Sequence, residues 1–130
     1  MNRAGSNPHG FAKDWEFSQS IIADGELVFT GGQGGFGPDG EVVSDDFEEQ
    51  LRQTYANLAA VLEAAGASLD TVVKTTVYLR RASDYATFGK VRHEMFTPPY
   101  PASTAIVATL LFDDMLVEMD AIARVGEARS

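Results

Sequence analysis

The middle of the chain holds the run VVKTTVYL at residues 72–79, in which β-branched and aromatic side chains dominate. A run of this composition predicts a β-strand. Segments of helical periodicity lie on both sides of it, because apolar side chains recur every three to four residues across 47–65 and again across 85–95. The centre of the chain therefore predicts a helix–strand–helix unit.

Residues with clear end signals bound the two predicted helices. Asp45 or Asp46 is suited to cap the first helix, and Gly66 follows its last apolar residue, where a C-terminal cap belongs. Three prolines within residues 98–101 end the second helix. Both helices are therefore expected to end where these signals stand.

Further strands are expected before and after this unit. Apolar clusters across 21–30, broken at Asp24-Gly25, predict a hairpin. Two final strands are expected over about 102–111 and 115–123, on either side of a turn at 112–114. The order of elements predicts an α+β fold, with a mixed, mainly antiparallel sheet and two helices on one of its faces.

The last predicted strand has two unlike faces. One is apolar and suited to meet the helices; it contains Met115, Val117, Met119, Ala121 and Ala123. The other is half apolar and half acidic; it contains Leu116, Glu118, Asp120 and Ile122. If the preceding strand pairs with it as a hairpin, it adds Ser103, Ala105, Val107, Thr109 and Leu111 to this second face.

An apolar patch of that kind on the second face is one that monomers tend to avoid. We therefore expect a second copy of the chain to cover this face. A solvated sheet face with a few exposed aliphatic side chains is the alternative.

Composition narrows the classes of function. The chain of 130 residues carries a net charge of −9, which disfavours a nucleic-acid partner, and it has no cysteine for disulfides or thiolate chemistry. We expect a flexible leader over 1–14, a single domain over 15–125 and a tail over 126–130. Without a recognisable signal peptide or membrane span, a cytoplasmic location is expected, with no membrane partner.

A glycine-rich segment at residues 31–40 has two interpretations. Six of its ten residues are glycine, and they surround Gln33 and Phe36. Exposed backbone N–H groups in such a loop form a possible anion-binding nest. The alternative is a wide turn that needs the backbone freedom of glycine.

Several blocks resemble one family in the same order. They are LVFTGGQ at 27–33, the helical segment 50–66, VVKTTVYL at 72–79, Pro101-Ala102, and VEMDAIA at 117–123. The chain is identified by them, over residues 17–123, as similar to the RidA/YjgF family of reactive-intermediate deaminases, also called endoribonuclease L-PSP. The resemblance implies a chorismate-mutase-like fold, a homotrimer and small-molecule clefts between subunits.

The resemblance also implies site residues. It makes Glu118 the catalytic group that positions the hydrolytic water, and it places Ser103 where active members carry an arginine that binds a carboxylate. It places a pocket aromatic at Phe17, the serine of a Ser-Gly-Gln turn at Gly31 and a helical asparagine at Gly89. The substrate-binding set expected here is Ser103, Phe17, Gly31, Gly32, Gln33, Tyr85, Gly89 and Asp120.

Serine cannot bind a carboxylate through two parallel hydrogen bonds as arginine does. We therefore expect inefficient hydrolysis of 2-iminopropanoate-like acids. Hydrolytic deamination of another imine or enamine, aminomuconate-like or aminoacrylate-like, stays open, with Glu118 as base or water-positioning group, Asp120 beside it, and no metal or cofactor. Arg80 or Arg81 is a candidate to replace the missing cation.

Two other functions are open to a member of this family. One is a trimer that binds a small molecule without catalysis. The other is a nuclease, which the net charge of −9 disfavours.

Overall fold

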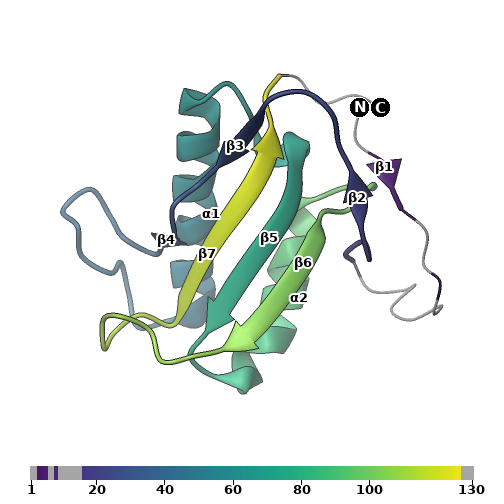
Figure 1. Ribbon diagram of the computed structural model, residues 1–130. Coiled ribbons are helices and arrows are strands. Elements are labelled where there is room, and N and C mark those ends of the chain that lie inside the picture. Colours follow the sequence, from purple (N-terminus) through teal and green to yellow (C-terminus); the bar gives the residue numbers. More distant parts are fainter. Residues whose placement is uncertain (1–2, 6–7, 9–15, 127–130) are drawn as a thin grey trace.

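The computed structural model describes residues 3–5, 8 and 16–126 and contains a sheet backed by two helices (Figure 1). The helices are α1 (Phe47–Ala64) and α2 (Tyr85–Met95). The strands are β1 (Arg3–Ala4), β2 (Ile21–Ile22), β3 (Leu27–Phe29), β4 (Gln33–Gly34), β5 (Val72–Leu79), β6 (Ala102–Val107) and β7 (Val117–Arg124). Within the described residues, no helix has both the length and the apolar character needed to cross a membrane.

The main sheet has the order β3-β7-β5-β6, and β4 also pairs with β7. Only β5 and β6 pair in parallel; β3, β4 and β5 are all antiparallel to β7. A parallel pair needs a long crossover, which α2 supplies between β5 and β6. The predicted mixed sheet with two helices on one face is confirmed, and the strand predicted at 72–79 has the same limits in the structure.

The predicted hairpin between the last two strands is wrong. The strand β6 lies beside β5, and residues 108–116 form a connection that brings the chain to the far side of β5. Ser103 is opposite Thr75, which is buried, so Ser103 and Ala105 lie on the helix side of the sheet. Val107 shares that side, whereas Thr109 and Leu111 lie outside the strand.

The predicted hairpin across residues 21–30 is also wrong. The strand β2 pairs with β1 in a separate two-stranded sheet, whereas β3 pairs with β7. Gly25, with a φ of 85°, makes the turn between them. Two strands joined by a turn need not pair with each other when better partners exist elsewhere in the chain.

Helix α1 has the limits and the buried face that its sequence predicts. The carboxylate of Asp46 accepts a hydrogen bond of 3.0 Å from the backbone N–H of Glu49, and Gly66 follows the helix with a φ of 84°. Its buried apolar residues pack on the inner face of β7, where Val117, Met119, Ala121 and Ala123 are buried as expected. The core therefore lies between the helices and the sheet.

Gln50 is a fully buried polar residue that joins α1 to the connection before β7. Its amide nitrogen donates to the backbone oxygens of Ser44 at 2.8 Å and Asp114 at 2.9 Å. Its amide oxygen accepts from the backbone N–H of Leu116 at 2.9 Å. One side chain thus satisfies three backbone groups and fixes where β7 begins.

We predict that Gln50→Leu destabilises the protein by about 3 kcal/mol or more, because three backbone groups lose their partner in a buried place. Urea unfolding followed by circular dichroism measures the change. The matched control is Gln53→Leu in the same helix, which removes only the hydrogen bond to Asn57. Equal stability losses in the two variants would contradict the role given to Gln50.

Candidate functional site

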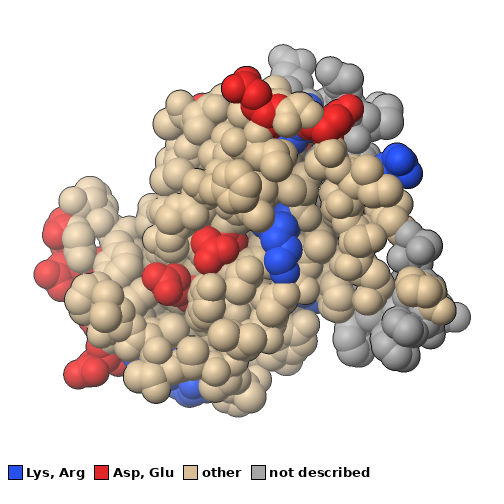
Figure 2. All heavy atoms as spheres, viewed as in Figure 1, with Lys and Arg blue, Asp and Glu red and all other residues tan. Residues whose placement is uncertain are grey.

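The face of the sheet away from the helices, called here the outer face, carries the predicted carboxylates. Glu118, Asp120 and Ile122 of β7 lie on it and are partly buried, as expected, whereas Leu116 precedes β7 and packs against the core. Strand register adds Tyr78 of β5, opposite Glu118, and Ile106 of β6, opposite Tyr78. Figure 2 shows this face as largely uncharged, with only a few acidic and basic groups near its middle.

Glu118 and Asp120 have different neighbours on the outer face. Asp120 accepts a hydrogen bond of 3.3 Å from the hydroxyl of Tyr78. Glu118 lies against Gly32, where an added Cβ would stand 2.6 Å from its Oε1. Any side chain at position 32 would therefore push Glu118 aside, so Gly32 is part of the surroundings of the predicted catalytic group.

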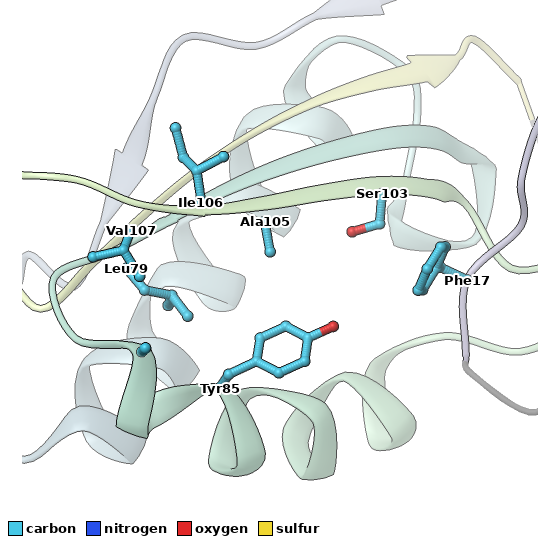
Figure 3. Close-up of a pocket in the computed structure, with 8 residues that line it drawn as sticks. Phe17, Leu79, Tyr85, Ser103, Ala105, Ile106 and Val107 are labelled. Carbon is cyan, nitrogen blue, oxygen red and sulfur yellow. The ribbon is translucent and has the colours of Figure 1, made fainter. Parts of the chain in front are cut away.

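A second feature is a cleft of about 490 Å³ on the other side of the sheet, between β6 and α2, called here the helix-side cleft. Its lining residues are Phe17, Leu79, Ala82, Tyr85, Ser103, Ala105, Ile106 and Val107 (Figure 3). In Figure 3 the hydroxyls of Tyr85 and Ser103 project into the space between β6 and α2, with Phe17 at one end. The walls are mainly apolar, and none of the described residues that line them is acidic.

Local contacts bring Phe17 and Ser103 together although they are far apart in the sequence. The backbone N–H of Ser18 donates a hydrogen bond of 3.0 Å to the backbone oxygen of Pro101. Ser18 also forms an isolated parallel β-bridge with Ala102. This places Phe17 beside the start of β6. The hydroxyl of Thr75 donates to Ser103 Oγ at 3.2 Å, which leaves the hydroxyl of Ser103 itself free to donate.

Gly89 belongs to the helix-side region by its position one turn after Tyr85 on α2. A Cβ added to Gly89 would meet no atom within 4 Å. The absence of a side chain there leaves open space beside α2, at the position where the family resemblance implies an asparagine.

The structure therefore divides the predicted site residues into two groups. Phe17, Tyr85 and Ser103 share the helix-side cleft, whereas Glu118 and Asp120 lie on the outer face, with Gly31 and Gly32 before β4 on that side. Gln33 is opposite Met119, which is buried under the helices, so Gln33 does not share a face with Glu118. Within one chain the two groups do not form one pocket.

The glycine-rich segment has packing reasons for its composition. A Cβ on Gly35 would lie 2.8 Å from the Cα and backbone oxygen of Gln50, so only glycine fits against α1 there. Asn57 donates to the backbone oxygens of Gly34 and Phe36, each at 2.9 Å. The N–H groups of residues 37, 40 and 43 all donate to backbone oxygens within the loop, so they are not available to an anion.

Arg92 is the notable residue that the sequence analysis did not assign to the site. Its side chain is only 8% exposed, and its guanidinium carbon lies 5.6 Å from the ring of Phe17, 5.9 Å from Tyr85 and 5.3 Å from Phe88. Two of these rings line the helix-side cleft. The signal was its position on the apolar stripe of α2, seven residues after Tyr85.

The two arginines considered as replacements for the missing cation have other partners. Arg80 donates to the backbone oxygens of Met115 at 2.6 Å and Phe112 at 2.7 Å. Arg81 forms an ion pair of 2.8 Å with Asp84. Neither is among the lining residues of the helix-side cleft.

Comparisons with known proteins agree on one family. The model of the endoribonuclease L-PSP family matches residues 9–125. A RutC family protein of Pyrococcus abyssi is 43% identical over 82% of this chain and 84% of its own length. A 2-iminobutanoate/2-iminopropanoate deaminase of Salmonella typhimurium is 34% identical over 76% of this chain and 80% of its own length.

Solved structures give the same result. The crystal structure of RidA from an Antarctic Psychrobacter has a TM-score of 0.72, with 32% identity over 95% of this chain and 94% of that one. The chain therefore belongs to the RidA/YjgF family, as its sequence blocks indicated.

We predict that Asp120→Asn lowers the pKa of Tyr78. The negative charge of Asp120 is the main cause that raises this pKa above its ordinary value of 10.0; partial burial and the hydrogen bond to Asp120 add to it. The folded state thus favours the neutral phenol. Its contribution to stability is complete below pH 10.0 and is lost as the pH rises through the raised pKa.

An ultraviolet absorbance titration of tyrosine measures this pKa, and Tyr78→Phe identifies the transition that belongs to Tyr78. Glu118→Gln is the control, because Glu118 is the smallest of the causes that raise the pKa. A Tyr78 transition unmoved by Asp120→Asn would show that the hydrogen bond on the outer face does not exist in solution.

Proposed function

We propose that this protein hydrolyses a small imine or enamine that carries a carboxylate, aminomuconate-like or aminoacrylate-like, in a site shared between copies of the chain. The observation that carries the proposal is the division of the site residues between two faces of one sheet. Among the described residues that line the helix-side cleft there is no carboxylate base, whereas Glu118 lies on the opposite face of the sheet. Contact between the cleft of one copy and the outer face of the next would complete the site.

Family membership supports the reaction class. Relatives that cover most of this chain are named 2-iminobutanoate/2-iminopropanoate deaminases in Salmonella typhimurium and in Homo sapiens. Fold alone does not fix function, so the proposal rests on the family together with Glu118. A trimer that binds a ligand without turnover is the second candidate; the position of Ser103, with no arginine in that place, favours it.

The proposed reaction needs little from the protein beyond orientation and one base. A protonated imine carbon is already electrophilic, so a bound water attacks it while Glu118 accepts the proton that the water loses. The resulting carbinolamine takes up a proton on nitrogen, the carbon–nitrogen bond breaks, and ammonia leaves as the carbonyl forms. One water is consumed, and no electron is transferred.

The exposed apolar side chains of the outer face support association of copies. Phe29, opposite Ile122 in the register, is 69% exposed, and Ile106 is 45% exposed. Val107 and Leu111, which the sequence analysis placed in this patch, are replaced by Phe29 and Ile106. An apolar sheet face next to partly buried carboxylates is typical of a surface that another protein covers.

We predict that Glu118→Gln lowers the rate of imine hydrolysis by about 100-fold or more, because glutamine cannot accept a proton from water. The assay follows ammonia release from 2-aminomuconate generated in the cuvette, with 2-iminopropanoate, formed by tautomerisation of 2-aminoacrylate, as the substrate expected to be slower. Glu26→Gln is the control for charge, since Glu26 lies outside this face's strands. A Glu118→Gln variant as fast as the unmodified protein would rule out the role of this carboxylate.

We predict that the unmodified protein sediments as a trimer and that Phe29→Asp shifts it toward monomers, because the variant buries a charge in the proposed interface. Sedimentation velocity measures both. The control is Leu111→Asp, which is more exposed, at 84%, but lies off the sheet. A monomeric unmodified protein would remove the second half of the site and with it the proposal.

A further inference from the structure

The guanidinium of Arg92 is buried beside the helix-side cleft without a counter-ion among the described residues. Its Nε and Nη1 atoms are buried, and no hydrogen-bond partner for them exists in the part of the chain that the structure describes. Its side chain is more than nine-tenths buried. A buried charge without a paired anion is strongly destabilising, because the charge has lost its hydration and gained no partner.

The aromatic rings around Arg92 offset only part of that cost. A cation–π contact attracts the charge to the face of the ring but supplies no acceptor for the N–H groups. Tyr55 lies close enough for the positive charge of Arg92 to lower the pKa of its hydroxyl, against the larger opposite effect of burial. The hydroxyl of Tyr55 also has no hydrogen-bond partner among the described residues. An aliphatic residue would fill this place without these unsatisfied groups.

We propose that Arg92 binds the carboxylate of a planar, unsaturated small acid in the helix-side cleft. Arg92 is not itself among the residues that line the cleft, but Phe17 and Tyr85, whose rings lie 5.6 and 5.9 Å from its guanidinium carbon, both line it. The guanidinium therefore lies behind these two rings, and an acid that inserts between them would reach it. The hydroxyls of Tyr85 and Ser103 project into the same space and are available as further donors (Figure 3). Apolar walls from Leu79, Ala105 and Val107 suit the remainder of such a molecule.

The charge distribution favours an anion in this cleft despite the net charge of −9. No acidic side chain lines it, and the nearby Asp84 is paired with Arg81. The proposal rests on the proposed function, because it gives that site its missing cation. The cation comes from α2 instead of β6, where the family resemblance implies an arginine at the position of Ser103.

The test measures binding of crotonate, a four-carbon unsaturated acid with no nitrogen to lose, and of its uncharged analogue crotonamide, by calorimetry. We expect the unmodified protein to bind crotonate more tightly than crotonamide. Arg92→Gln should weaken crotonate by about tenfold or more, the loss typical of a charged hydrogen bond, and leave crotonamide unchanged. Arg81→Gln, an exposed arginine in an ion pair at the start of α2, is the control that should change neither.

Two further measurements extend the test: the first serves if Arg92→Gln does not fold, and the second applies when it folds. In crystals of the unmodified protein soaked with crotonate, the carboxylate should lie within hydrogen-bond distance of the Arg92 guanidinium. In the variant Ser103→Arg with Arg92→Gln, the arginine on β6 should restore crotonate binding. Equal affinity for crotonate and crotonamide, no crotonate binding, or a carboxylate bound away from Arg92 would each overturn the proposal.

The failure of this proposal and of the proposed function can be told apart. If Glu118→Gln loses turnover while Arg92→Gln binds crotonate normally, the deaminase function stands and the role of Arg92 falls. If crotonate binds to Arg92 but no imine is hydrolysed, Arg92 keeps its role and the protein is a ligand-binding member of the family.

Discussion

Side-chain alternation along β7 is the constraint on which the rest of the structure depends. Because consecutive residues of a strand face opposite sides, burial of Val117 and Met119 under the helices forces Glu118 and Asp120 onto the outer face. The cleft between β6 and α2 lies on the helix side. Rearranging side chains among the described residues of one chain does not bring a β7 carboxylate into that cleft, and this separation is the geometric reason for proposing a site shared between copies.

The parts of the fold that local periodicity specifies could be predicted from the sequence. The strand at 72–79, the caps of α1 and the two faces of β7 all follow from patterns within a dozen residues. Pairing partners could not be predicted, because a period of two residues says which face a side chain takes but not which strand lies beside it. That is why β6 was placed beside β7 and why Ser103 was assigned to the wrong face.

The same limit applies to the candidate site: local patterns place some of its residues, and the others depend on which distant segments meet in the fold. Glu118 and Asp120 could be placed because their strand has a clear apolar face, and Phe17 and Ser103 could be paired only through the family resemblance, since they are far apart in sequence. Arg92 was not assigned to the site because an arginine is usually a surface charge, although its position lies on the apolar stripe of α2. Its burial depends on aromatic rings from two separate segments, which no local pattern reports.

The central position of β7 has a consequence for how the chain assembles. The strands β3, β4 and β5 all find their antiparallel partner in β7, which is the last strand to be synthesised. Until that segment leaves the ribosome, β5 has only its parallel partner β6, and β3 and β4 have no partner in the main sheet. The apolar side of α1 then has only partial cover, and exposed apolar surface of this kind promotes aggregation of incomplete chains.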